Sequence, residues 1–462
     1  MTINKAHLVM LAETGILPRG DACSIARALR DIEADTDIAG LSYTGEYEDF
    51  FFLVEAELHK RLGDLGGALH TARSRNDMDH TLFKMALRSR TRDTLGLLNS
   101  LTGALIVKAR AERDMPIVAY THGQPAQPTT FGHYLGAVIE VLLGDTQRLL
   151  AATGALGQCP MGAAAITTSG FPINRQRVAD LLGFGEPKLN SYGCIAAVDY
   201  ITGLYSALKL VFLHLGRVAQ DMAFWSAFEV GQLHVPDALV QISSIMPQKR
   251  NPVPIEHMRH LASATMGHCD TVMNTMHNTP FTDMNDSEGE VQQAGYAAFQ
   301  SGNRMLQLFT VFLPACTIDA ARVQRNADAA CITITELADT LVRTEALSFR
   351  TAHQIAAATA RAVIAAGTPL GEGYAAFASA FAREAGRAPG IDQAVFREAV
   401  AMHTFIARRD RPGGPAPAAL DAALAIYQAR SDEMQTEIRR VADREIAAET
   451  TLGTAFANLL ET

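Results

Sequence analysis

The sequence predicts an all-α protein in which long helices pack as a bundle. Aromatic residues make up only 7% of the chain, and alternating runs of β-branched residues, which usually indicate strands, are nearly absent. Apolar residues instead recur every three or four positions over long stretches with few helix breakers. Long helices separated by short connections are typical of an up-and-down bundle. The predicted helices span residues 92–112, 131–151, 199–225, 254–276, 291–313 and 327–342.

The segment 199–225 stands out because apolar residues cover most of its circumference. Such a helix is buried on nearly all sides, in the middle of a bundle or at a contact between subunits. The run ITIT at 332–335 lies inside a helical pattern, whereas Pro and Gly in 411–418 predict a loop or linker. A chain of 462 residues exceeds what one hydrophobic core usually serves, so we expect two or three domains.

Charge and cysteine usage exclude several classes of function. Lys and Arg total 40 against 49 Asp and Glu, and there is no long run of like charge, so we expect no nucleic-acid partner. The N-terminus lacks the apolar core of a signal peptide, and no apolar run is long enough to span a membrane. We therefore expect a cytoplasmic protein with no membrane partner, whose six cysteines are reduced and buried.

Polar segments interrupt the helical pattern at residues 69–81, 119–130 and 230–257. In the last of these, Pro247 and Pro252 prevent a continuous helix before about residue 252. Lys249 and Asn251 then lie near a helix N-terminus, where a cation, an amide and free N–H groups suit a carboxylate. A loop with a solvated pair of cations is an equally open interpretation.

The first polar segment offers Arg73, Arg75 and Asn76 as a fork for binding a carboxylate. It also fits an Arg-rich helix start whose local partners are Asp77 and Asp79, and both interpretations stay open.

The second polar segment places His122 between Thr121 and Gly123, close to Gln124. A histidine can transfer protons near neutral pH, but a single histidine is more often structural. His257 and His260 have the spacing of a metal pair, yet no third ligand occurs at a recognisable spacing, so we expect no metal site.

Together, the polar segments resemble the fumarase/aspartase superfamily and, within it, the argininosuccinate lyase branch. SSIMPQKRNP at 243–252 is similar to the signature loop G-S-S-x-M-P-x-K-x-N-P. HTARSRND at 70–77 resembles H-T-G-R-S-R-N-D, and YTHGQPAQP at 120–128 resembles Y-T-H-x-Q-x-A-Q-P. Shorter likenesses extend this collinear match over most of the chain, which makes chance agreement very improbable.

The resemblance implies a C–N lyase that removes a proton next to a carboxylate and releases fumarate from an N-substituted aspartate. It implies that Ser243 is the base and that Lys249 and Asn251 hold the carboxylate and its dianionic aci-form. His122 would help to protonate the leaving amine, with Glu256 as its charged partner. The expected binding residues for the succinyl carboxylates are Ser74, Arg75, Asn76, Thr121, Gln124 and Asn251.

The resemblance also implies three helical domains, at 1–75, 76–325 and 326–462. The central domain would contribute its long helices to a twenty-helix core in a homotetramer, with each active site drawn from three subunits. The substrate would be a small dicarboxylate, and we expect no cofactor and no metal. Closure of residues 230–242 would exclude water and bring in Ser243.

Some residues depart from the pattern of the branch. Ile242 stands where the signature usually has Gly, and Phe51 stands at a His position. Pro280, Asn285 and Glu288 replace the Tyr, Gln and Lys that contact substrate in the branch. Two alternatives therefore remain: a relative acting on other N-succinyl amines or aminopolycarboxylates, similar to ethylenediamine-disuccinate lyase, and a catalytically retired structural protein of the crystallin type.

Overall fold

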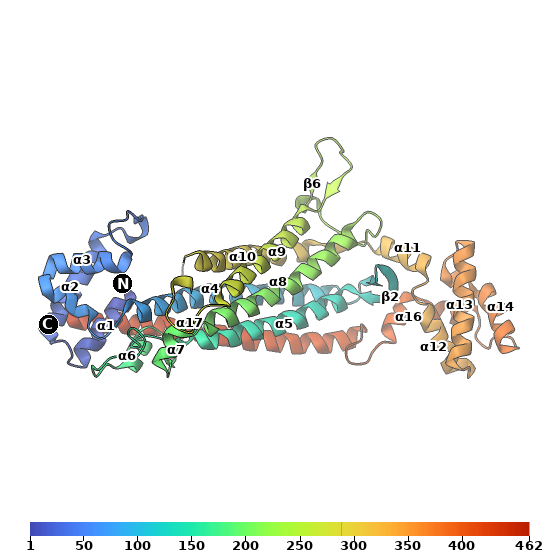
Figure 1. The fold of residues 1–462 in the computed structure, drawn as a ribbon. Coiled ribbons are helices and arrows are strands. Elements are labelled where there is room, and N and C mark those ends of the chain that lie inside the picture. The colour runs from blue at the N-terminus through green and yellow to red at the C-terminus, as the bar shows by residue number, and fades with distance from the viewer. Residues whose placement is uncertain (288, 462) are drawn as a thin grey trace.

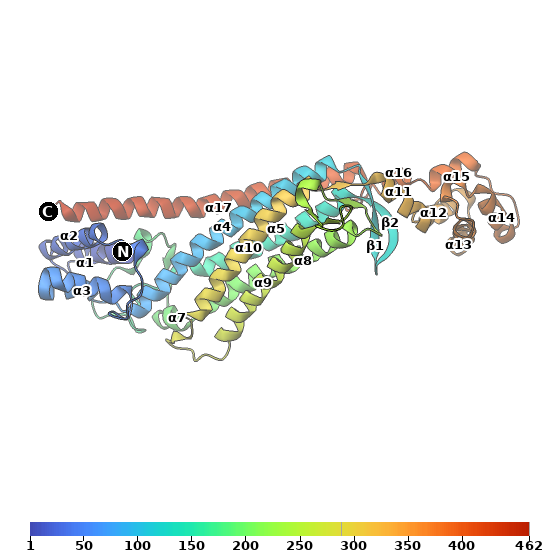
Figure 2. The same cartoon turned by 90° about the horizontal axis from the view of Figure 1, so that it is seen from above.

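The computed structural model describes residues 1–287 and 289–461, and it confirms the predicted all-α class. Figures 1 and 2 show an elongated bundle along which the last long helix runs back toward the N-terminus. The helices of the bundle are α4 (Arg75–Ala111), α5 (Phe131–Leu156), α8 (Asp199–Ser226), α9 (Val253–Met276), α10 (Glu290–Ala315) and α17 (Pro417–Leu460).

Local sequence signals explain where these helices begin. Ser74 caps α4 in a capping box with Asp77, so the helix starts well before the predicted residue 92. The Thr130 side chain accepts a hydrogen bond from the His133 N–H and caps α5. The first turn of α9 contains a proline, as the sequence predicts, because proline needs no hydrogen-bond acceptor there.

Small residues allow the bundle helices to approach closely. Gly295 and Gly302, seven residues apart on α10, face Tyr205 and Phe212, which are seven residues apart on α8. A Cβ atom at either glycine would collide with the ring opposite, so larger residues there would push the helices apart. On its other sides α8 lies against α5 and α9, which explains its mostly apolar surface.

A second hydrophobic cluster lies at the end of the bundle that carries both chain termini (Figure 1). It joins the first helices to residues 159–161 and 178–184 and to the last turns of α17. The elements of this region are α1 (Thr2–Glu13), α2 (Arg19–Asp35), η1 (Ile38–Gly40), α3 (Phe50–Leu62), η2 (Gly63–His70), α6 (Arg175–Leu181) and α7 (Ser191–Ala196).

A separate group of short helices, the C-terminal helical group (residues 331–407), packs around its own apolar cluster at the opposite end. The prediction of one helix over 327–342 is wrong at residues 331–333. Cys331 has φ 50°, a left-handed conformation that ends α11, and ITIT spans the break. The elements here are α12 (Ile334–Glu345), α13 (Phe349–Ala366), η5 (Leu370–Glu372), α14 (Tyr374–Ala385), α15 (Gln393–Ala399) and α16 (Met402–Ala407). Helix α11 (Ala320–Ala330) precedes the group and buries its apolar residues in the cluster of the bundle.

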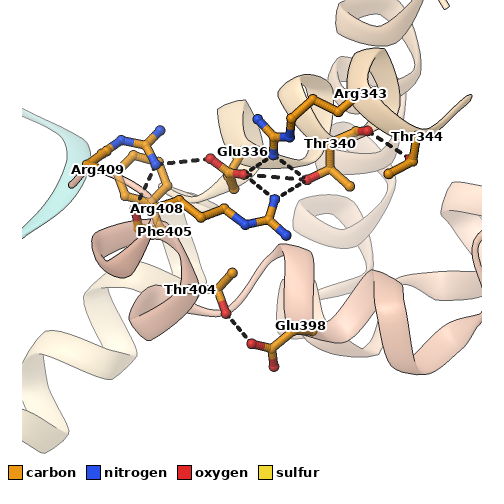
Figure 3. A network of polar contacts seen from close by, with 9 residues as sticks. All are labelled: Glu336, Thr340, Arg343, Thr344, Glu398, Thr404, Phe405, Arg408 and Arg409. Carbon is orange, nitrogen blue, oxygen red and sulfur yellow. Dashed lines mark hydrogen bonds and ion pairs between the residues drawn. The ribbon is translucent and has the colours of Figure 1, made fainter. Parts of the chain in front are cut away.

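Glu336 fastens this group to the chain that returns to α17. Its carboxylate is buried and accepts hydrogen bonds from Arg343 on its own helix and from Arg408 and Arg409 on the returning segment (Figure 3). The predicted linker at 411–418 follows directly, but its last two residues already belong to α17, which begins at Pro417. The group is thus tied to the bundle through a charged contact at its base.

Short strands, which the sequence did not predict, form two-stranded ladders in the described part of the chain. Two of these ladders are antiparallel hairpins: one overlaps the polar segment 119–130, and the other falls within the polar segment 230–257. The pairs are β1 (Pro116–Thr121) with β2 (Gln124–Thr130), β3 (Gln158–Cys159) with β4 (Glu186–Pro187), β5 (Leu233–His234) with β8 (Thr317–Ile318), and β6 (Gln241–Ile242) with β7 (Arg250–Asn251). Residues Asp237–Leu239 (η3) and Asn285–Ser287 (η4) form single 3₁₀ turns.

Two further expectations concern the cysteines and membrane-spanning segments. All six cysteines are free and buried, as the sequence predicts. None of the helices in residues 1–287 and 289–461 is long and apolar enough to cross a bilayer.

Candidate active site

The start of α4 anchors the first polar segment. The buried carboxylate of Asp77 accepts hydrogen bonds from the backbone N–H groups of Ser74, Gly162 and Ala164. Burial raises the pKa of Asp77 to about 6, although these hydrogen bonds and the charge of Arg73 oppose the rise. Asp77 therefore fixes the loop around residue 162 against the helix end that carries Arg75 and Asn76.

Carboxylates of the same chain already hold Arg75. Its guanidinium lies 3.0 Å from Glu48 and 2.9 Å from Asp49, and it stacks on the ring of Phe52. The hydrogen bond to Glu48, which outweighs the opposing effect of burial, raises the pKa of Arg75, and Asp49 adds to the rise. Arg75 thus presents a charged fork at the surface, as carboxylate binding requires.

Arg73 has a structural position instead. It is buried, donates to the Asn4 side chain at 2.7 Å, and lies over the ring of Phe51, the residue at the His position of the branch. The neighbouring Ala72, at the Gly position of the branch motif, has φ 62°. A non-glycine residue in this left-handed region is strained, so the turn into α4 is held in place by its surroundings.

Asn76 connects α4 to two distant loops. Its side-chain amide donates to the carbonyl of Ala165 at 3.1 Å and to the carboxylate of Asp283 at 2.8 Å. Asp283 lies in the segment that departs from the branch pattern. Pro280 and Asn285 are both exposed in the same segment, and Glu288 lies outside the described residues.

His122 occupies the tip of the hairpin formed by β1 and β2. Thr121 pairs with Gln124, so His122 and Gly123 form a two-residue turn, with φ 53° and 73°. Left-handed conformations at both positions are typical of the type I′ turn that suits a hairpin. Thr121, His122 and Gln124 are all exposed, and the ring of Tyr120 packs edge-on against Phe224 to fix the hairpin on α8.

Ser243 begins the loop that joins β6 to β7. Its hydroxyl oxygen accepts hydrogen bonds from the backbone N–H groups of Met246, at 3.0 Å, and Ile245, at 3.4 Å. Ile242 and Ile245 are 72% and 82% exposed, although isoleucine is normally buried. Figure 1 shows this hairpin projecting away from the bundle, which agrees with the exposure of these two side chains.

Lys249 and Asn251 follow on the same hairpin. Lys249 is exposed, and Asn251 lies directly before Pro252, the N-cap of α9. Glu256 is in the first turn of α9 and is exposed as well. The predicted pairing of Glu256 with His122 is not made within the single chain, since no hydrogen bond between them occurs among its described residues.

The fold places the first polar segment far from the second and third, which meet near the end of α8, where the Gln232 side chain is hydrogen-bonded to the backbone of Val118. Asn76 lies at the start of α4, whereas His122 follows its end, and a 37-residue helix is roughly 55 Å long. Ser243 projects on its hairpin from the ends of α8 and α9 (Figure 1). One chain therefore does not bring the predicted site residues together.

The sequence analysis missed Asp283 as a partner of Asn76 and Asp77 as the anchor of the loop at 162–164. The contact between Asn76 and Asp283 joins residues 207 positions apart, and no spacing rule indicates such a pair. Asp77 carried a visible signal, because it stands three residues after Ser74 in a capping box, but its further partners lie far away in the sequence.

Comparisons with known proteins agree with this architecture. The lyase family matches residues 4–267, and the family described as the argininosuccinate lyase C-terminal region matches residues 331–407. Argininosuccinate lyase 2 of Agrobacterium fabrum is 55% identical over 99% of this chain and 91% of its own length. Argininosuccinate lyase of Methanothrix thermoacetophila is 32% identical over 96% of this chain and 88% of its own.

Solved structures lead to the same superfamily. EDDS lyase in complex with formate superposes with a TM-score of 0.90 at 27% identity, covering 100% of this chain and 91% of that one. Recombinant class II fumarase from Schistosoma mansoni shares the fold, with a TM-score of 0.69 at 15% identity over 87% and 88% of the two chains. These matches agree with the segments that carry Arg75, His122 and Ser243. The chain therefore belongs to the argininosuccinate lyase family of carbon–nitrogen lyases.

Proposed function

We propose that this lyase eliminates the amine from argininosuccinate, giving arginine and fumarate. The similar proteins named argininosuccinate lyase support this substrate, because one of them is 55% identical over nearly the whole chain. The single structural observation that supports the chemistry best is the pair of backbone N–H groups directed at the Ser243 oxygen.

The chemical difficulty is the weak acidity of the C–H bond next to a carboxylate. A free serine hydroxyl is a feeble base, so Ser243 must react as an alkoxide. The N–H groups of Ile245 and Met246 and the charge of Lys249 favour that form, because donors and cations stabilise a negative oxygen. Ser243 then takes the proton while Lys249 and Asn251 stabilise the dianionic aci-carboxylate.

The leaving amine needs a proton as the C–N bond breaks. His122 is suited to this step because the turn holds its side chain at an exposed tip and because histidine exchanges protons near neutral pH. Glu256 is also exposed and would orient the ring from a neighbouring subunit. Arg75, Asn76 and Thr121 would bind the succinyl carboxylates, with Ser74 and Gln124 beside them.

A complete site then needs more than one chain. The separation of Asn76 from His122 by the length of α4 supports a homotetramer in which each site takes segments from three subunits. Exposed apolar side chains on the bundle, including Val107 on α4 and Val311 on α10, at 68% and 66%, fit burial between subunits. The same assembly would cover Ile242 and Ile245 on the projecting hairpin.

A second candidate is a lyase that acts on another N-succinyl amine or an aminopolycarboxylate. Its support is the close superposition on EDDS lyase, together with the departures at Pro280 and Asn285. The presence of Ser243, His122 and Lys249 argues against the third alternative, a retired structural protein.

The test is direct, because fumarate absorbs in the ultraviolet. The purified chain is incubated with argininosuccinate, and the absorbance of fumarate and the release of arginine are followed together. We expect both products in equal amounts. If argininosuccinate is not turned over, yet amines other than arginine add to fumarate, the second candidate function is correct.

A further inference from the structure

The amide of Asn76 has no hydrogen left for a substrate in this structure. A side-chain amide carries two N–H groups, and here one donates to the Ala165 carbonyl and the other to the Asp283 carboxylate. Arg75 differs, since a guanidinium has five N–H donors and keeps some free beside Glu48 and Asp49. Asn76, unlike Arg75, must therefore give up one of its present hydrogen-bond acceptors before it can bind a substrate carboxylate.

The partner of Asn76 is itself a carboxylate, and it is held at the surface. Asp283 is exposed and lies in the connection between α9 and α10, where the Thr282 N–H closes a tight turn on the Pro280 carbonyl. A second contact fixes the same turn: the ring of Phe281, which is 67% exposed, stacks on Tyr192 of α7 at 6.1 Å. The hydrogen bond to Asn76 and the ring contact with Tyr192 therefore hold residues 280–283 against the start of α4 and against α7.

We propose that Asp283 occupies the position of a substrate carboxylate on Asn76, so that residues 280–283 form a latch that the substrate must displace. The proposal rests on the proposed function, in which Asn76 binds the succinyl group. The 2.8 Å bond shows that this N–H donates to a carboxylate in its present orientation, and the bond to the Ala165 carbonyl keeps the amide from turning away. Substrate and Asp283 then compete for one donor.

The latch changes the affinity for a dicarboxylate in a defined direction. While Asp283 is on Asn76, an incoming dicarboxylate has to replace an existing charge-assisted hydrogen bond, so its net gain is reduced. Removing the charge of Asp283 should therefore tighten dicarboxylate binding, whereas removing a residue that merely supports the site would weaken it. This opposite sign separates a competing residue from a structural one.

The experiment measures inhibition by succinate, and its direct binding by calorimetry, for the full-length protein and two variants. Asp283→Asn removes the competing charge, and we expect succinate to bind about three- to tenfold more tightly. Asp286→Asn is the matched control, because it removes the same charge three residues away on the same exposed segment. We expect the control to change the affinity less than twofold, by roughly 0.4 kcal/mol at most.

A second measurement follows the latch itself. Hydrogen exchange of the backbone amides of residues 281–283 should accelerate when succinate binds, and in an Asp283→Ala variant it should be fast without any ligand. Equal affinities for the two Asn variants, or weaker binding by Asp283→Asn, would overturn the latch. Turnover of argininosuccinate by the unaltered protein, measured alongside, shows whether such a failure concerns only the latch or the proposed function as well.

Discussion

The Glu336 carboxylate on α12 accepts a hydrogen bond from Arg409, 3.0 Å away on the segment that returns to α17. Arg408 donates to the same buried carboxylate at 2.7 Å, and Arg343 donates from the next turns of α12 (Figure 3). One negative group therefore compensates three positive ones at the base of the C-terminal helical group. Its removal would leave partly buried cations facing each other.

The first prediction follows from this imbalance. Glu336→Gln keeps the size of the side chain but loses its charge, and we expect a loss of about 3 kcal/mol in the free energy of unfolding. Denaturant unfolding followed by circular dichroism measures the change. Glu384→Gln, which breaks a more exposed pair with Arg383 in the same helical group, should cost no more than about 1 kcal/mol. Similar losses in both variants would show that Glu336 is not the fastening point.

A second prediction concerns the base. Ser243→Ala should lower kcat by about a hundred- to ten-thousandfold, because the proton acceptor is gone. The residue lies on a projecting loop and packs little, so the melting temperature should stay within about 1 °C. Ser244→Ala is the control and should keep most of the activity. Near-native turnover of Ser243→Ala would transfer the role to another group.

Mixing two inactive variants tests whether sites are shared between chains. If His122 and Ser243 of one site come from different subunits, equal amounts of His122→Asn and Ser243→Ala chains should form hybrid tetramers. Random assembly then restores about a quarter of the original sites. Activity is measured after the chains are mixed, mildly dissociated and reassociated. No recovery, although mass spectrometry detects hybrids, would mean that both residues act within one chain.

The fourth prediction concerns acid stability. Burial, reinforced by Lys84 and Lys188, lowers the pKa of His80 from 6.5 to about 4, so the folded chain keeps this ring neutral while the unfolded chain protonates it. Stability is therefore lost as the pH falls below about 6.5, by about 2 kcal/mol at pH 5. Asp77 has the opposite effect, since its raised pKa favours the folded state as the pH falls from about 6 to 3.8.

His80→Gln should flatten the dependence of the melting temperature on pH between 7.5 and 5, although loss of the contact with the Tyr200 hydroxyl lowers the melting temperature at both values. The exposed His353 provides the control, and His353→Gln should leave the dependence unchanged. A slope in His80→Gln as steep as that of the unaltered protein would assign the acid sensitivity to other groups, such as the buried His7.

The sequence predicted the long helices well because their apolar period reflects packing that each helix makes along its whole length. It missed the hairpin at His122, since a two-residue turn between short polar strands leaves no alternating pattern. The break at Cys331 was missed because the left-handed residue is not glycine. Contacts such as Asn76 with Asp283 depend on how distant loops meet, which local spacing does not encode.

The unbroken course of α4 has a consequence for how this chain tolerates insertions and deletions. Removing two turns, seven residues, would shorten the distance between Asn76 and His122 by about 10 Å while turning the helix face by only about 20°. Such a deletion preserves the buried stripe of the chain itself, but in the proposed tetramer it would shift the two ends of the helix relative to the segments that the neighbouring subunits contribute to each site. We expect surface loops of related chains to vary in length while this helix keeps a constant number of residues.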